Sequence, residues 1–388
     1  MKDPIINALE NALMQLNELP ELKKDLGKRP LSNPVKILAI GKSAFPMAKV
    51  CVNILTKRKI NYSGYLLTKY GNVSEIIPNL IVRKAGHPIP DKNTIKHSQE
   101  ILSWLEGLQE IDELIILISG GGSSLFEVPV DGFTLEDLIH FNKNLLQSGL
   151  NIKEINDERA KKSKVKAGKA LAYIKAKIIY CYALSDVQNN EPDVIASGCF
   201  FPVNSQKIDD NHYQAKLKKG RQELCYSIIG DNFSLRYQLA KALTSPVDVQ
   251  TQYFIENAEN VANSLTNFAF SANKKGIYIF GGEASVHVSG NGKGGRCTHL
   301  ALLMAKKIAG KKHITFYALA GDGNDNLENV SGACVNQNTA NQLQEKGIDI
   351  SSALKNCDSY TALKAIDAII PSWSYPLNLN DIYILQIY

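Results

Sequence analysis

Short apolar runs rich in Val, Ile and Leu alternate along this chain with longer segments that have the apolar spacing of helices. Residues 35–40 (VKILAI) and 114–118 (LIILI) are almost continuously apolar, which is typical of strands buried on both faces. Residues 43–56 and 93–108 have helical periodicity instead. This alternation predicts an α/β fold with mostly parallel sheets, in which ligands bind at the carboxyl ends of the strands.

The same alternation continues to the C-terminus, and a chain of 388 residues is long enough for two domains. We predict a Rossmann-like N-terminal domain over residues 1–225 and an α/β C-terminal domain over residues 226–388. The last strand, within 380–388, can belong to either domain. Residues 202–224 are polar and lysine-rich, so we expect a surface excursion or a linker there. Further strands are expected near 62–68 and 79–84, and further strand–helix units at 134–149, 165–186, 226–243, 248–270, 277–309 and 314–347.

Composition excludes several classes of protein. A formal net charge of +6 is mild for this length, and the basic residues are not interleaved with aromatic ones, so we expect no nucleic-acid partner. The seven cysteines are scattered without a C-x-x-C pair, which argues against a disulfide framework or a zinc site and for a reducing compartment. No apolar run reaches the ~20 residues that span a bilayer, so we expect a cytoplasmic protein without a membrane partner.

Two glycine-containing segments follow the most apolar strands. Gly41 and Lys42 come after 35–40, where a tight turn can lead into a helix N-terminus that attracts anions. Lys36 stands where the common P-loop requires glycine, so this is not that motif. Plain turns are the alternative for both segments, but three glycines after a buried strand favour an anion-binding loop. The run after 114–118 is Ser119, Gly120, Gly121, Gly122 and Ser123.

Single polar residues at other strand ends are weaker candidates. His87 lies in a loop fixed by two prolines, and a lone loop histidine is more often structural. Asp186 ends an apolar strand, where a carboxylate suits a metal ion or a hydroxyl group but also suits a helix cap. Asp322 and Asp325 form a similar acidic cluster after the strand ITFYALA, with Mg²⁺ binding and a polar Asx turn as the alternatives.

The longest glycine-rich segment lies between Glu283 and Arg296. Residues 290–295 fit G-x-G-x-x-G, which alone is weak evidence for a dinucleotide site. We interpret Gly294 and Gly295 as part of a phosphate-binding loop, with Arg296 in the first turn of the next helix. Several anion-binding loops, two cations and carboxylates at strand ends together are what phosphoryl transfer requires.

Six segments together resemble the glycerate 2-kinase family, whose C-terminal part is the MOFRL domain. In chain order they are ILAIGKSAFPMA, GHPIPD, LISGGGSSLFEVPVDGFTLEDL, INDERAKKSKVKAGKAL, SDVQNNEPDVIASG and FGGEASVHVSGNGKGGR. The resemblance implies two α/β domains with the active site in the cleft between them. It implies transfer of a phosphoryl group from ATP to D-glycerate with Mg²⁺, giving 2-phosphoglycerate, and it leaves a homodimer open.

The resemblance also implies roles for individual residues. Lys42 and Arg296 would be the essential cations, and Asp186 would orient the substrate hydroxyl group or the metal ion. Glu283 and Asp322 would have the same role, and the triple glycine would bind an anionic group. The chain departs from the family pattern after Arg296, where Cys297-Thr298-His299 replaces Asn-Gln-Glu. The alternatives are an NAD(P)-dependent hydroxypyruvate reductase and a non-catalytic descendant that binds a ligand.

Overall fold

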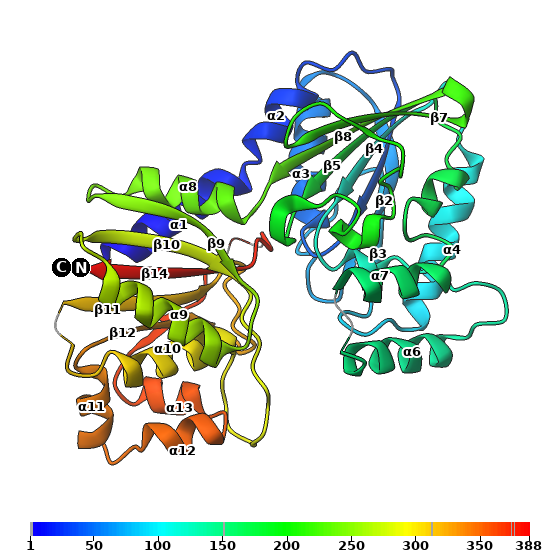
Figure 1. Cartoon of the computed structure of the whole chain (residues 1–388). Coiled ribbons are helices and arrows are strands. Elements are labelled where there is room, and N and C mark those ends of the chain that lie inside the picture. The colour runs from blue at the N-terminus through cyan, green and yellow to red at the C-terminus, as the bar shows by residue number, and fades with distance from the viewer. Residues whose placement is uncertain (1–2, 150–151, 312, 374, 376) are drawn as a thin grey trace. The chain divides into compact units, whose positions relative to one another are not determined.

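The computed structural model describes residues 3–149, 152–311, 313–373, 375 and 377–388, and the chain divides into two compact units (Figure 1). The N-terminal unit is Glu18–Asp231. The C-terminal unit combines α1 (Pro4–Asn17) with Asn232–Tyr388. The expected boundary after residue 225 falls inside a strand, β8 (Gln222–Gly230), which pairs along its whole length in the N-terminal sheet.

The N-terminal unit is built on an eight-stranded sheet that is parallel except at one edge. Its other strands are β1 (Val35–Ile40), β2 (Tyr62–Lys69), β3 (Leu80–Ala85), β4 (Glu113–Ile118), β5 (Ile178–Leu184), β6 (Gln206–Lys207) and β7 (His212–Leu217). The order is β3-β2-β1-β4-β5-β8-β7-β6, and only β7 and β6 run antiparallel to their neighbours. Residues 202–224 therefore contribute the antiparallel edge of this sheet and do not link the two units.

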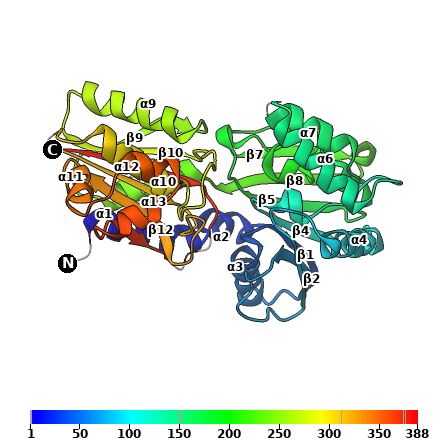
Figure 2. The ribbon, with the colours of Figure 1, turned by 90° about the horizontal axis from the view of Figure 1, so that it is seen from below.

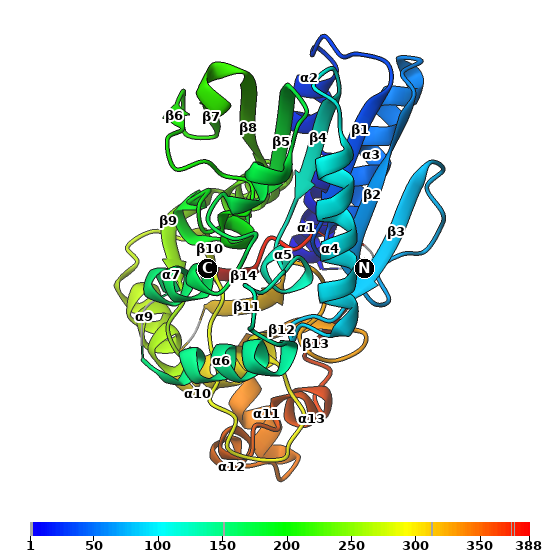
Figure 3. The same cartoon turned by 90° about the vertical axis from the view of Figure 1, so that its right-hand side faces the viewer.

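Helices cover both faces of this sheet, as Figures 2 and 3 show for α3 (Ala44–Lys57) and α4 (Lys92–Gly107). Ile116 and Ile118 of β4 pack toward Ile101 and Leu105 of α4 in one apolar core. Side chains alternate between the faces of a strand, so Ile115 and its neighbours of the same parity face α3. The remaining helices of this unit are α2 (Pro20–Leu26), α5 (Gly122–Leu125), α6 (Leu135–Gln147) and α7 (Ile152–Lys161), with the 3₁₀ turns η1 (Lys169–Tyr173), η2 (Gln188–Asn190), η3 (Ile195–Gly198) and η4 (Lys218–Gly220).

The C-terminal unit contains a six-stranded mixed sheet. Its strands are β9 (Val247–Phe254), β10 (Gly276–Gly282), β11 (Ile314–Ala320), β12 (Val330–Asn336), β13 (Ile369–Pro371) and β14 (Asp381–Ile387), in the order β13-β12-β11-β14-β10-β9. The last strand, red in Figure 1, runs antiparallel between β10 and β11, so it belongs to this unit and does not return to the first. Among the described strands of this sheet, β9 and β10 are the one parallel pair. Strands β10 and β11 point in the same direction, but β14 lies between them and is antiparallel to both.

The two faces of this second sheet are covered by different helices. Phe280 and Phe316 face a core formed with α9 (Ala258–Ser271) and α10 (Arg296–Lys307). The side chains that alternate with Phe280 and Phe316 along these strands lie on the other face, which is covered by α8 (Asn232–Ala242) and α1. On that face the Tyr317 hydroxyl donates to Asp3, beside α1. The first helix therefore belongs to the C-terminal unit because its apolar face is buried there. Three short helices complete the unit: α11 (Thr339–Glu345), α12 (Ile350–Lys355) and α13 (Ser359–Lys364).

The predicted α/β class is thus confirmed, and the strand at 35–40 has the bounds that its sequence indicated. The helices expected at 43–56 and 93–108 also form, each displaced by one residue. In the part of the chain that the structure describes, no helix is both long enough and apolar enough to cross a membrane.

Candidate active site

The loops that follow β1 and β4 are joined to each other by hydrogen bonds. The two strands are neighbours in the N-terminal sheet, so their carboxyl ends lie side by side. The backbone N–H of Lys42 donates to the carbonyl of Gly120 (2.9 Å), and that of Ser43 donates to the Ser119 hydroxyl (3.0 Å). These bonds fix the backbone of Lys42 against the triple-glycine loop.

Gly121 is the position in this loop where a side chain would not fit. Its φ of +80° lies in the left-handed region that favours glycine. A Cβ there would approach both Lys42 Cγ and His87 Nε2 to 2.9 Å. The structure thus brings together three of the predicted segments, from the loops after β1, β3 and β4. Peptide groups of a glycine-rich loop can approach an anion closely.

The electrostatics of this cluster favour a negatively charged ligand. In the described part of the chain, no group hydrogen-bonds or ion-pairs with the half-buried ammonium group of Lys42. Burial, together with the charges of Lys42 and Lys69, lowers the pKa of His87 to about 4. His87 is therefore neutral at pH 7, and Lys42 supplies the positive charge at this position.

Not every residue of the glycine run is placed to contact a ligand. Ser119 is fully buried, and its hydroxyl accepts the hydrogen bond from Ser43, so it supports the loop from behind. A Cβ on Gly122 would approach the Ala196 side chain to 2.8 Å, so this glycine allows η3 to pack closely. Ser123 shares a hydrogen bond with the Ser197 hydroxyl (2.7 Å). Of the residues of this run, Gly121 is therefore the one that lies against Lys42 and His87.

Asp186 lies at the same edge of the sheet. It follows β5, which pairs with β4 in register so that Ile118 lies opposite Ala183. Asp186 is half-buried, two residues beyond the end of that strand. The structure thus places a carboxylate one strand away from the glycine loop, and its role in orienting a hydroxyl group stays a prediction.

The second predicted cation, Arg296, begins α10 in the C-terminal unit and is held by two carboxylates. Asp381 forms a bidentate pair with it, through Nε to Oδ2 (2.6 Å) and Nη2 to Oδ1 (2.9 Å). Glu283 accepts from Nη1 at 2.9 Å. The carboxylate of Glu283 thus binds Arg296. From the sequence we expect it to orient the substrate hydroxyl group or the metal ion.

Sequence reasoning missed Asp381, the buried partner of Arg296. It begins the last strand and is 0% exposed, whereas the Arg296 side chain is 34% exposed. Burial raises the pKa of Asp381 to about 6, although Arg296 acts in the opposite direction. Burial disfavours the charge on Arg296, but Asp381 and Glu283 outweigh it and raise the pKa of Arg296. Both groups are therefore charged at pH 7, and the guanidinium group is fixed in one orientation.

Other atoms of the protein lie close to the positions where a Cβ would stand on the glycines before Arg296. A Cβ on Gly294 would approach the Ser359 hydroxyl to 2.3 Å, and one on Gly295 would approach the Asp325 carbonyl to 1.9 Å. These glycines permit close packing of neighbouring segments on the side where a Cβ would lie. Binding of an anion by Gly294 and Gly295 therefore stays a prediction.

The acidic residues proposed as metal ligands have structural roles here. Asp325 is buried, and its two carboxylate oxygens accept the backbone N–H groups of Cys297 and Thr298, each at 2.8 Å. Burial raises the pKa of Asp325, while these donors lower it. Asp322 accepts the N–H of Asn324, which is the Asx turn given as the alternative. Among the described residues, no group of three or more His, Cys, Asp or Glu side chains is placed to hold a metal ion.

Two family models and several known proteins match this chain over most of its length. Residues 5–221 match a family described as a domain of unknown function, DUF4147, and residues 276–381 match the MOFRL family. A D-glycerate 2-kinase of Thermotoga maritima is 34% identical, over 94% of this chain and 93% of the relative. A putative hydroxypyruvate reductase of Agrobacterium vitis is 30% identical, over 89% of this chain and 97% of the relative. The crystal structure of a glycerate kinase from Thermotoga maritima superposes with a TM-score of 0.83 at 31% identity, covering 99% of each chain.

Proposed function

The chain belongs to the glycerate 2-kinase family, and from this premise we propose that it transfers a phosphoryl group from ATP to the 2-hydroxyl group of D-glycerate. The products would be 2-phosphoglycerate and ADP. The observation that carries the proposal is the ammonium group of Lys42, which has no partner among the described residues and lies beside the Gly121 loop and the neutral His87.

Lys42 is the residue that we assign to the transferring phosphoryl group. Phosphoryl transfer spreads negative charge over the transferred group, so catalysis depends on positive charge that is already in place. The hydrogen bonds that join the loops after β1 and β4 hold the backbone of Lys42. Its ammonium group has no protein partner in the described residues to give up when an anion binds. A preorganised cation of this kind stabilises the transition state without a cost of reorganisation.

Arg296 is the residue that we assign to the carboxylate of glycerate or to a phosphate oxygen. Three of its five N–H groups donate to Asp381 and Glu283, which leaves one on each terminal nitrogen for a ligand. A planar guanidinium group held in this way suits a bidentate anion. Asp186 would accept a hydrogen bond from the attacking hydroxyl group and orient it.

ATP fits the chemistry of the Lys42 loop, since a cation beside a glycine-rich loop suits a phosphate group. When bound, ATP supplies the phosphoryl group. The described residues form no ready-made Mg²⁺ site, so no step proposed here depends on an ion held by the protein. We expect Mg²⁺ to arrive with the phosphates of ATP, as is common in kinases, with Asp186 as the carboxylate that we assign to it.

The structure gives the reductase alternative no support of its own. A dinucleotide-binding G-x-G-x-x-G segment directly joins a strand to a helix. Here β10 ends at Gly282, well before Gly290, and a Cβ on Gly290 would meet Asn356 at 2.5 Å. Gly290 and Gly292 thus pack against Asn356 and Asp358, between α12 and α13. The name of the Agrobacterium vitis relative is what remains in favour of a reductase.

The test is ADP release by the purified protein with ATP, Mg²⁺ and D-glycerate. L-glycerate, and hydroxypyruvate with NADH, serve as substrate controls, and ³¹P NMR distinguishes the 2-phosphate from the 3-phosphate. Lys42→Met should lower turnover by about a hundredfold or more, because an essential phosphate clamp is commonly worth about 3 kcal/mol or more. Lys49→Met is the matched control, since Lys49 lies on the exposed side of α3 and pairs with Glu75 at the surface. Oxidation of NADH without release of ADP would replace this proposal with the reductase.

We also propose that the protein works in the cytoplasm with glycerate and ATP as its small-molecule partners. All seven cysteines are unpaired in the structure, as suits a reducing compartment. Cell fractionation tests the compartment, and light scattering after size-exclusion chromatography tests the homodimer left open by the resemblance.

A further inference from the structure

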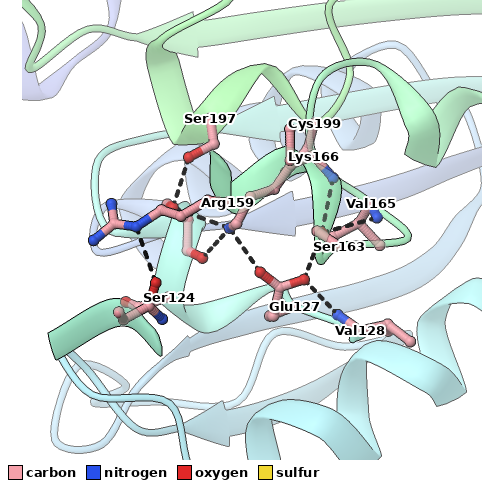
Figure 4. A network of polar contacts seen from close by, with 12 residues as sticks. Ser124, Glu127, Val128, Arg159, Ser163, Val165, Lys166, Ser197 and Cys199 are labelled. Carbon is pink, nitrogen blue, oxygen red and sulfur yellow. Dashed lines mark hydrogen bonds and ion pairs between the residues drawn. The ribbon is translucent and has the colours of Figure 1, made fainter. Parts of the chain in front are cut away.

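A buried ion pair lies behind the glycine loop and takes no part in the chemistry proposed above. The ammonium group of Lys166 is 2.9 Å from Glu127 Oε2, and their side chains are only 3% and 2% exposed. Figure 4 shows the two side chains pointing toward each other. Neither residue stood out in the sequence, where Lys166 is one of several lysines between 161 and 169.

Lys166 donates mainly to the residue that follows the triple glycine. Its ammonium group donates to the Ser123 carbonyl (2.6 Å) and to the Ser123 hydroxyl (3.1 Å), and its third partner is Glu127. An ammonium group has three N–H donors, so all of them are used. Ser123 lies in α5, which begins directly after Gly121. A helix of four residues cannot satisfy its own carbonyl groups, and Lys166 provides a donor to one of them.

Glu127 and Ser163 hold Lys166 in turn. Glu127 Oε1 accepts from the Ser163 hydroxyl (2.5 Å) and from the Val128 N–H (3.0 Å). The Ser163 hydroxyl also accepts the backbone N–H of Lys166 (3.1 Å). Each polar group of the network therefore has a partner, which makes such a network rigid.

The same segment stabilises an unusual turn on the other side of Ser123. Ala196, Ser197 and Gly198 have φ values of 49°, 56° and 62°, three successive residues in the left-handed region, which non-glycine residues rarely adopt. The N–H groups of Ala167 and Gly168 donate to the carbonyls of Ser197 (3.0 Å) and Gly198 (2.8 Å). Strain of this kind persists only where the surroundings hold it, and it is concentrated at functional sites.

We propose that Lys166 is a positioning residue that fixes the Gly121 loop in its anion-binding shape through Ser123. This inference rests on the proposed kinase function. Glu127 neutralises Lys166, so the pair acts through geometry and adds no net charge beside the ligand. Replacing a buried ion pair by neutral residues of similar volume is often harmless to stability, which makes an effect on the loop separable from unfolding.

The test uses the double variant Lys166→Met/Glu127→Gln, because the single variant would leave Glu127 buried without a partner. The matched control is Lys164→Met/Asp131→Asn, which removes a surface ion pair (2.6 Å) of the same turn. We expect the buried double variant to lose about tenfold or more in kcat with little change in KM for ATP, since small displacements of catalytic groups act mainly in the transition state. The surface control should match the wild type.

Hydrogen exchange gives a readout that does not depend on activity. The amides of Ser124 and Leu125 donate to the Gly121 carbonyl, each at 3.2 Å. They should exchange faster in the buried double variant, while exchange in α4 and the unfolding midpoint stay unchanged. Unchanged exchange at these amides would overturn the positioning role, even if the wild type proved to have no kinase activity. Faster exchange with a normal kcat would overturn its link to catalysis.

Discussion

Replacing Asp381 with asparagine tests whether Arg296 works only when it is held in place. The substitution keeps the shape of the side chain and removes its charge. Asp381 is fully buried and forms a bidentate pair with Arg296, so the amide that replaces the carboxylate could accept one of the two hydrogen bonds at most. The guanidinium group would then keep only one charged partner, Glu283, which is 47% exposed.

The expected loss follows from the burial of the pair. Removing one partner of a buried ion pair costs about 3–5 kcal/mol, because the other charge is left without compensation. Arg296 is 34% exposed and water can solvate it in part, so we expect about 2–3 kcal/mol in the free energy of unfolding. If the released guanidinium group no longer contacts the ligand, kcat/KM should fall by about a hundredfold, which corresponds to about 2.7 kcal/mol.

Urea unfolding measures the first quantity and coupled ADP release the second. Glu283→Gln is the control for stability, because an exposed ion pair contributes about 0–1 kcal/mol. The pH dependence provides a further check. Since the pKa of Asp381 is raised to about 6, kcat/KM of the wild type should fall as the pH drops through 6 and the carboxylate takes up a proton. That acidic limb should vanish in Asp381→Asn, and a variant with wild-type kcat/KM would refute the reasoning.

Three further predictions concern other parts of the candidate site. Gly121→Ala should lower kcat about tenfold, because about 1–2 kcal/mol of backbone strain and the 2.9 Å approach of its Cβ to Lys42 and His87 would displace the loop. Turnover of a folded variant at the wild-type rate would contradict this. The folded pKa of His87, about 4, lies below its unfolded value of 6.5, so its contribution to stability is full above pH 6.5 and is lost as the pH falls toward 4. Stability measured across that window should therefore decline less in His87→Gln than in the wild type. Asp325→Asn should lower the free energy of unfolding by about 1–2 kcal/mol by weakening the cap of α10, whereas a chelator should leave the unfolding midpoint of the ligand-free wild type unchanged.

The parts of the fold that the sequence predicted best are those with a strong local signal. Strands β1 and β4 are buried on both faces, so nearly every residue in them is apolar and their bounds are visible in the sequence. The position of β14 is different. Its sequence, DIYILQI, identifies a strand but not its partners, and only the structure shows that it pairs with β10 and β11. Pairing between distant segments depends on packing that no local pattern encodes.

The candidate site shows the same division. Lys42 and the triple glycine could be placed together from sequence, because both follow buried parallel strands and such ends share one edge of the sheet. Asp381 could not be linked to Arg296, since 85 residues separate them and an aspartate at the start of a strand has no distinctive signal. Lys166 was hidden for a related reason, because its partner Glu127 lies on another segment and nearby lysines such as Lys164 are at the surface.

The two glycine-rich segments of this protein, after β4 and before α10, differ in which atoms lie where a Cβ would stand. At Gly294 and Gly295 that space is occupied by backbone and side-chain atoms of the same unit, so these glycines serve packing. At Gly121 it is bordered by Lys42 and His87, two side chains that can act on a ligand. A glycine motif is therefore evidence for an anion site only when an uncommitted cation borders the same space. By that criterion we propose the loop after β4 as the anion site, whereas the glycines of the G-x-G-x-x-G segment pack against other residues and the neighbouring Arg296 is positioned by Asp381.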